Sequence, residues 1–167
     1  MNNRIQRLFL GIIVLLMCSG AFALSTDRDQ PTQIEADRVD VDDKKGISTF
    51  RGNVKLTRGS ILMTADKVKV YRDKNKDVDK ILAWGNPVRY KQRPDKRKED
   101  VIAQAKKVEY NAVKGKLILQ DSARIRQGKD IFTGSRIVYD INRDVVRASK
   151  APAGKERVQI TIQPKKK

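Results

Sequence analysis

A short pattern returns four times along this chain and constrains its fold more than any other feature. It starts at Ala36, Ala65, Ala105 and Gly134, and each copy has a cation two positions later and apolar side chains at the third and fifth positions. The starts are separated by 29, 40 and 29 residues, and extra polar residues at 72–80 and 91–100 account for the longer interval. Repeats of this length are typical of stacked units, none of which can bury an apolar face alone. The sequence therefore predicts an array of units packed side by side.

Between these starts, polar and apolar residues alternate over short stretches that turn-forming residues interrupt. The last stretch alternates strictly, with Val158, Ile160 and Ile162 on one face. Segments such as Arg51–Asn53 and Asn111–Gly115 carry the Gly and Asn residues typical of turns. Period two with such interruptions roughly every 8 to 12 residues indicates antiparallel β-structure. Because no sustained helical period follows the first residues of the chain, we predict an all-β fold.

The small residue that opens each copy predicts a bend. Before Ala65 the apolar side chains stand at odd positions (Ile61 and Met63), whereas after it they stand at even positions, beginning with Val68. A strand that continues can change the face of its apolar side chains only through a bulge or bend, which a small side chain permits. We therefore expect bent pieces of sheet that feed two facing layers and stack into a long, two-layered antiparallel roll.

The inward-facing positions of such a roll are mostly Val and Ile, so a core made of them alone would be thinly packed. Because large voids are costly unless something fills them, an acyl chain is the natural filler. The candidate residues of this lipid-binding groove are Val39, Phe50, Val54, Val68, Trp84, Val108, Ile137 and Tyr139. The alternative is that the interior is plugged by its own aromatic side chains, which are Phe50, Trp84, Tyr90, Tyr110 and Tyr139.

Neither end of the array carries an obvious capping element. The first strand is expected around Gln33 and Ile34, and the last around Val158, Ile160 and Ile162. Uncapped terminal strands are templates for pairing, so these residues predict head-to-tail strand addition, a contact that grows filaments. Capping of the last strand by the short basic tail, residues 164–167, is the alternative.

The amino-terminal residues indicate export from the cytoplasm. Arg4 and Arg7 precede an apolar run at 8–17, and Ala21-Phe-Ala23 is a small-x-small cleavage signal. We therefore predict a signal peptide at 1–23 that is removed after Ala23. The run is too short for a comfortable membrane span, which leaves a retained anchor as the alternative. Residues 24–163 then form a single domain of ordinary size.

Composition excludes several classes of site. The chain contains no histidine and one cysteine, Cys18, which lies in the predicted signal peptide. We therefore predict no metal, no cofactor and no thiol or histidine chemistry in the exported protein. The formal net charge of +17 favours anionic partners. With few aromatic residues to stack on bases, a nucleic acid is not expected, and a phosphorylated glycolipid fits an exported protein better.

Several segments in a fixed order resemble the OstA-like family of periplasmic lipopolysaccharide-transport proteins. These segments are Asp29–Asp37, Phe50–Val54, Ala65–Val68, Gly85–Pro87 and Gly134–Tyr139, and the resemblance covers about residues 27–163. It implies a V-shaped β-jellyroll of about sixteen antiparallel strands, with a lengthwise apolar groove that holds the acyl chains of lipid A. It also implies a periplasmic bridge of head-to-tail oligomers that carries lipopolysaccharide from an inner-membrane LptC-like subunit to an outer-membrane LptD-like translocon.

The resemblance also assigns individual residues. The groove contacts of the family match Thr32, Ile34, Tyr90 and Tyr110, and a basic position near the ligand matches Arg72. No catalytic residue is implied, because the acidic residues lie among Lys and Arg rather than as the paired carboxylates that glycoside cleavage needs. A ligand-free structural or adhesive β-fibre is the first alternative function. A polysaccharide-cleaving enzyme built from stacked strands is the second.

Overall fold

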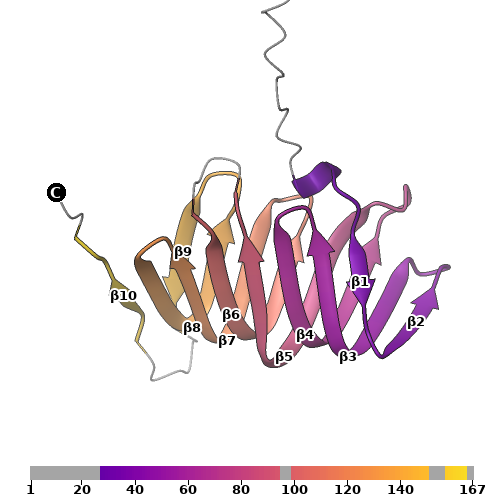
Figure 1. Ribbon diagram of the computed structural model, residues 1–167, viewed down its shortest axis with the longest axis horizontal. Helices are drawn as coiled ribbons and strands as arrows, with labels where there is room; N and C mark the ends of the chain where they lie inside the picture. Colours follow the sequence, from indigo (N-terminus) through magenta and orange to yellow (C-terminus); the bar gives the residue numbers. More distant parts are fainter. Residues whose placement is uncertain (1–26, 95–98, 151–156, 165–167) are drawn as a thin grey trace, which may run out of the picture.

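The computed structural model describes residues 27–94, 99–150 and 157–164, so the predicted signal peptide lies outside the described residues (Figure 1). After a single 3-10 turn, η1 (Asp27–Asp29), the chain is built from strands. They are β1 (Gln33–Glu35), β2 (Arg38–Asp42), β3 (Ile47–Arg58), β4 (Ile61–Arg72), β5 (Val78–Gln92), β6 (Val101–Asn111), β7 (Lys116–Gln127), β8 (Asp130–Asp140), β9 (Val145–Ser149) and β10 (Gln159–Thr161). The prediction of an all-β fold is confirmed.

The strands pair with antiparallel neighbours in the order β1-β3-β4-β5-β6-β7-β8-β10, while β2 also pairs with β3 and β9 with β8. Figure 1 shows the result as a long stack of bent strands, with β1 and β2 at one end and β9 and β10 at the other. Sequence neighbours are thus also spatial neighbours, as expected of an array. Among the described residues, no helix has the length and apolar character needed to cross a membrane.

The long strands β3 to β8 are each bent near their middle. The pairing register shifts between Thr64 and Lys67 in β4 and between Gln104 and Lys107 in β6. The small residues Ala65 and Ala105 lie in these irregularities, and the register of β8 shifts beside Gly134. The prediction that the repeat marks bends is confirmed.

Each bend divides a long strand into two arms that belong to different layers, and with the four short strands this makes sixteen strand segments. Layer A contains β1, 54–58, 61–65, 88–92, 101–105, 123–127, 130–134 and β10. Layer B contains β2, 47–51, 67–72, 78–84, 107–111, 116–120, 136–140 and β9. The bends therefore form one long edge of the molecule. The hairpin turns, which we call the tips of the arms, lie at the far end of each layer.

Some sequence signals that predicted turns are bulges within continuous strands instead. Strand β3 runs through the predicted turn at Arg51–Asn53, and β7 likewise runs through Asp121 and Ser122. The φ angles of Gly52 (78°), Asn53 (46°), Asp121 (64°) and Ser122 (54°) are all positive. Two consecutive left-handed residues insert a bulge that turns the strand toward the other layer without reversing its direction.

The inner faces of layers A and B bury one contiguous hydrophobic cluster that includes Val54, Leu56 and Met63 from layer A and Leu117, Leu119 and Ile137 from layer B. In β4 the buried positions change from odd (Ile61, Met63, Ala65) to even (Val68, Val70) at the bend. The strand therefore presents apolar side chains to the interior in both arms, as the change in the sequence pattern predicted.

The bulge at Gly52 supplies a stability test. A Cβ at this position would overlap the carboxylate of Asp37, which also accepts a hydrogen bond from Asn53 Nδ2 at 2.9 Å. Because residue 52 is left-handed as well, Gly52→Ala is expected to cost at least about 1–2 kcal/mol of the free energy of unfolding. Urea denaturation measures this loss. Thr57→Ala, in the regular part of the same strand, is the control, and equal losses in both variants would contradict a conformational role for Gly52.

Candidate functional site

The candidate site is the apolar seam, which we define as the space between the inner faces of layers A and B. Three tyrosines meet there: Tyr90 comes from layer A, and Tyr110 and Tyr139 come from layer B. Their exposed fractions are 1%, 4% and 0%. Burial raises the pKa of Tyr90 well above its ordinary value, and the neighbouring Tyr110 adds to this effect. The phenol is therefore uncharged, and the interior carries no negative charge from this group.

The middle of the seam is closed. The side chains of Val88, Val108, Leu117, Leu119 and Ile137 have no exposed surface, to the nearest percent. A water-sized void between the layers would expose part of the side chains that line it. No such void therefore lies beside these residues. This differs from the expectation of a trough too thinly lined to close. The Val and Ile positions alone would leave the core thin, but the large rings of the tyrosines fill the space between the layers.

Most of the predicted groove residues lie in this seam. Val54, Val68, Tyr90, Val108, Tyr110, Ile137 and Tyr139 belong to the buried cluster, and Ile34 and Phe50 pack against it. Thr32 is half-buried immediately before β1. The repeat residues from distant parts of the sequence are thus brought together by the stacking of the strands.

Trp84 lies on the outer face of layer B rather than in the seam. Its neighbour Ala83 is fully buried on the inner face, and side chains alternate along a strand. The ammonium group of Lys67 lies 5.4 Å from the centre of the Trp84 ring. The prediction that Trp84 lies in the seam is therefore wrong, because the alternation within β5 directs its side chain outward.

At both ends of the stack the seam is open. Val39 and Val41, on β2, pair with the inward-facing positions of β3 but remain 53% and 57% exposed. At the opposite end Ile160 of β10 pairs with Phe132 and is 53% exposed, and the following Ile162 is 74% exposed. Strand addition would bury these apolar side chains.

The structure places the predicted edge residues on terminal strands. Gln33 and Ile34 belong to β1, which pairs with β3 alone among the described strands, and Ile160 belongs to β10, which pairs with β8 alone. Val158 and Ile162 flank β10, which is shorter than the predicted strand. Sequence reasoning did not identify β2 and β9 as terminal strands. They lie at the same two ends of the stack and form its edges in layer B. Each end therefore offers one free edge in each layer.

A polar network that sequence reasoning missed lies at the tips of layer A. The hydroxyl of Tyr90 donates a hydrogen bond to Gln92 Oε1 at 2.7 Å, and Gln92 Nε2 donates to Asp27 Oδ2 at 2.8 Å. The backbone N–H of Ser60 donates to Asp27 Oδ1 at 2.6 Å. The η1 turn is thereby fixed to the rim of the seam. Gln92 could have been found, because it continues the inward alternation of Val88 and Tyr90.

A second polar contact crosses from one layer to the other. Gln127, at a tip of layer A, donates from Nε2 to Asp144 Oδ1 at 3.2 Å, and the hydroxyl of Tyr139 donates to the same oxygen at 3.1 Å. Asp144 lies in the turn between β8 and β9, which belongs to layer B. This contact ties the two layers together at their free ends near the β9–β10 end of the stack.

Arg72, the predicted basic contact, lies at a tip of layer B. Its Nη2 atom forms an ion pair with Asp43 Oδ1 at 2.9 Å, and its side chain is 26% exposed. It borders an open hollow of about 460 Å³ that is also lined by Lys44, Lys45, Lys74 and Lys76. Five cations therefore lie together beside Asp43 and Asp73 at this tip, where a phosphate group could be bound.

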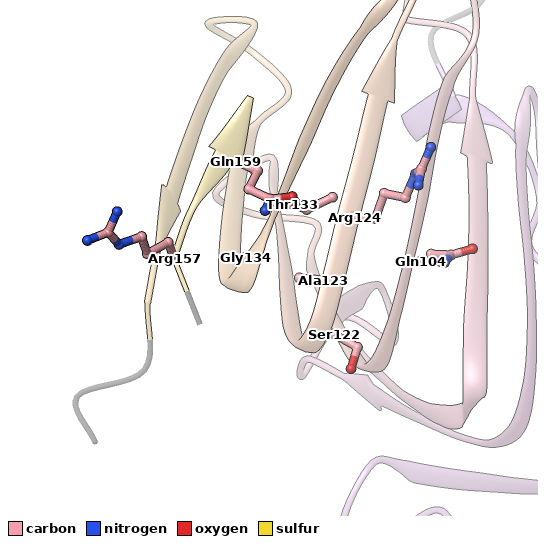
Figure 2. A pocket seen from close by; sticks show the side chains of 8 residues that line it. All are labelled: Gln104, Ser122, Ala123, Arg124, Thr133, Gly134, Arg157 and Gln159. Atoms are coloured by element: carbon pink, nitrogen blue, oxygen red, sulfur yellow. The ribbon is translucent and has the colours of Figure 1, made fainter. Parts of the chain in front are cut away.

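A further hollow, of about 370 Å³, lies near the β10 end of the sheet (Figure 2). Arg124, Arg157, Gln104 and Gln159 are among its lining residues, so it is polar and does not suit an acyl chain. The described residues contain no cluster of three or more side chains that could hold a metal ion. Among these features, only the apolar seam and its two open ends suit a long apolar ligand.

Comparison with known proteins identifies the family. Residues 33–145 match the family described as LptA/(LptD N-terminal domain) LPS transport protein. Over 96% of its length the chain is 35% identical to the lipopolysaccharide export system protein LptH of Pseudomonas aeruginosa, 94% of which is covered. It is 36% identical to LptA of Haemophilus influenzae, covering 98% of this chain and 92% of the relative.

The structural comparison agrees with the sequence relationship. A crystal structure of Pseudomonas aeruginosa LptH, titled the LptA-homologous periplasmic component of the lipopolysaccharide transport device, superposes with a TM-score of 0.78 and 32% identity. The match covers 84% of this chain and all of that chain. Because both the family match and the relatives extend over most of its length, this chain belongs to the LptA/LptD N-terminal domain family of lipopolysaccharide transport proteins.

Proposed function

We propose that this protein is the periplasmic component of a lipopolysaccharide export system, in which it binds lipopolysaccharide and carries it from the inner to the outer membrane. The observation that carries this proposal is an apolar seam that runs between two layers and ends in exposed apolar side chains at both ends of the stack. The curated relatives, which are named for lipopolysaccharide export, support it. Catalysis is not part of the proposed function.

The acyl chains would enter by separating the layers at their tips. The hydrogen-bond ladders run within each layer, and the layers are joined along the bends by continuous strands, so the tips can move apart without breaking a ladder. Acyl chains would replace the contacts between layers A and B with similar apolar contacts. The tie from Asp144 to Gln127 and Tyr139 is a polar contact that this opening would break.

Head-to-tail association would extend the seam beyond one subunit. Of the six strongly exposed large apolar side chains among the described residues, Val39, Val41, Ile160 and Ile162 lie at the two ends. Pairing of β1 and β2 of one copy with β10 and β9 of the next would satisfy the free strand edges and bury these side chains. The contact is heterologous and does not close, so it produces a filament.

The same edges suit the proposed partners at each membrane. An LptC-like subunit at the inner membrane and an LptD-like translocon at the outer membrane would each add strands to one free end. The predicted signal peptide would direct export to the periplasm, and its removal after Ala23 would release the mature chain. The alternatives predict different outcomes, because a ligand-free fibre protein would assemble without lipopolysaccharide and an enzyme would act on a glycan.

Photo-crosslinking tests whether lipid occupies the seam. Phe50 and Trp84 are aromatic residues of layer B on opposite faces, so a benzophenone side chain can replace either one with little change in size. We expect residue 50 to trap lipopolysaccharide in cells and residue 84 to trap several-fold less. Gel mobility and antibody detection measure the adduct, and equal trapping at both positions would count against a seam that binds acyl chains.

Bridging the layers tests the opening mechanism. The exported chain lacks cysteine, so Gln127→Cys with Asp144→Cys provides one thiol on each layer for a short bifunctional reagent. We expect bridging to prevent loading with lipopolysaccharide, and cleavage of a reducible linker to restore it. Native mass spectrometry measures the bound glycolipid.

The matched control for this experiment joins two positions of the same layer. Gln127 and Asp130 are paired residues of neighbouring strands in layer A, so Gln127→Cys with Asp130→Cys leaves the layers free to separate. Loading should persist in the bridged control. Full loading of the protein bridged across the layers would refute entry between them.

Truncation tests the assembly. Removal of residues 157–167 deletes β10 and the exposed Ile160 and Ile162, so we expect shorter oligomers in light scattering with little loss of thermal stability. Removal of 164–167 alone takes away only the basic tail and is the control. If both truncated proteins kept the full oligomer mass, the β10 edge would have no role in assembly.

A further inference from the structure

The cation that recurs in each repeat faces away from the seam, and the proposed lipid transport does not use it. The four repeat cations are Arg38, Lys67, Lys107 and Arg136. Each of them directly precedes an inward-facing position (Val39, Val68, Val108 and Ile137), so side-chain alternation places all four on the outer face of layer B. A fifth cation, Arg51, is paired with both Arg38 and Lys67.

The pairing register aligns these residues in a single row beside the bends, which we call the bend row. From β2 across layer B, the row contains in order Arg38, Arg51, Lys67, Trp84, Lys107 and Arg136. The two remaining positions, Gln120 and Ser149, are uncharged. Directly paired side chains on one face lie on neighbouring strands about 4.8 Å apart, so the row runs along the long axis of the stack.

The bend row keeps a positive charge when its neighbours are counted, because eight cations face five acidic residues: the five cations of the row, Lys69 and Arg147 of the next outer row, and Lys106 in the bends. Asp40 and Glu109 lie in the next outer row of layer B, two residues along the strand from Arg38 and Lys107. Asp40 also forms an ion pair with Arg51. In the bends, Asp37 accepts a hydrogen bond from Asn53, while Asp66 and Asp121 are exposed. Like charges that are paired directly across neighbouring strands destabilise a sheet. The three consecutive cations Arg38, Arg51 and Lys67 therefore lower the folding stability, and an anionic partner would offset this loss.

The opposite side of the bends adds to this charge. The first outer row of layer A contains Lys55, Arg89 and Arg124, with uncharged Thr64 and Gln104 between them. Lys55 lies 3.6 Å from Glu35, the acidic residue of this row. Cations therefore border the line of bends on both sides, at the edge of the molecule farthest from the tips.

We propose that the bend row binds a linear anionic polysaccharide, separate from the lipid in the seam. The strand spacing of about 4.8 Å is close to the length that one sugar adds to an extended polysaccharide, so successive carboxylate or phosphate groups can meet successive positions of the row. Trp84 lies within the row and offers a ring face on which a sugar can stack. Guanidinium groups of Arg38, Arg51 and Arg136 can hold such anions through two parallel hydrogen bonds.

The geometry favours a polymer over a membrane surface. A β-sheet twists, so a row that crosses eight strands is not straight, and a flexible chain can follow it where a flat bilayer touches only part of it. The apolar side chains in the adjacent row, Leu82, Ile118 and Val138, are half-buried and provide no protruding anchor for a bilayer. Five of the eight positions along this one line carry a cation, which suits a linear polyanion.

The test measures binding of the full exported chain to fragments of a linear polyuronate, which has one carboxylate on each sugar. Dextran fragments of equal length are the neutral control. The bend-row variant combines Arg38→Gln, Lys67→Gln, Lys107→Gln and Arg136→Gln. Its affinity should fall about tenfold, as the loss of four exposed ion pairs would give. The dependence of the affinity on salt should also weaken, because fewer cations meet the polymer.

The matched control removes the same charge from the tips. It combines Lys114→Gln, Arg126→Gln, Lys129→Gln and Arg143→Gln, all of which are exposed residues in or beside the hairpin turns and outside the hollow near Arg72. Its affinity should stay within about twofold of the parent. Circular dichroism on heating checks that both variants fold. Trp84→Leu should weaken binding to the polyuronate more than binding to polyphosphate, which has no sugar to stack.

Three results would overturn the proposal. Equal losses in the bend-row and tip variants would show that only net charge attracts the polymer. Tighter binding to vesicles of phosphatidylcholine and phosphatidylglycerol than to the polyuronate would assign the row to a membrane surface. Absence of polyuronate binding by the parent would also refute the proposal. None of these measurements depends on lipid in the seam, so the proposed lipopolysaccharide transport can fail or succeed independently.

Discussion

The bend in the middle of each long strand is the constraint on which the rest of this structure depends. It lets one continuous strand contribute to two layers, so the hydrogen-bond ladders of both layers are made by the same chain segments. Small residues at 65, 105 and 134 and the left-handed residues at 52–53 and 121–122 make these bends possible. Without them the strands would form one flat sheet with an unpaired apolar face, and the seam would not exist.

The bends also separate the two faces on which different chemistry is placed. On the inner side, three tyrosines and the aliphatic side chains close the middle of the seam, while apolar residues remain exposed at both ends. This arrangement leaves apolar surface exposed at both ends, where a lipid or another subunit can cover it. On the outer side, the register of the same strands aligns the repeat cations beside Trp84. A single repeated sequence pattern therefore supplies the inner apolar positions and the outer charged row together.

The closed seam has a consequence for how a ligand could be bound and released. In the described part of the chain, layers A and B are joined by the continuous strands that cross the bends, and at the tips they meet through side chains such as Gln127, Tyr139 and Asp144. Separation of the tips would exchange apolar contacts between layers for apolar contacts with acyl chains, so its free-energy cost is smaller than that of opening a hydrogen-bonded sheet. The tyrosine hydroxyls at the rim, including Tyr90 with Gln92, mark the boundary between the apolar seam and water.

Local patterns in the sequence were enough to predict the strand periodicity, the four repeat starts, the change of apolar face at Ala65 and the family resemblance, because each depends on residues close together in the chain. They also predicted most of the seam residues, since Val68, Val108 and Ile137 occupy one repeat position and Tyr110 and Tyr139 another. Those patterns did not reveal that Gly52 and Asn53 form a bulge, that Trp84 faces outward or that the tyrosines close the seam. These outcomes depend on strand register and on packing between layers, and both arise from contacts between residues far apart in the sequence.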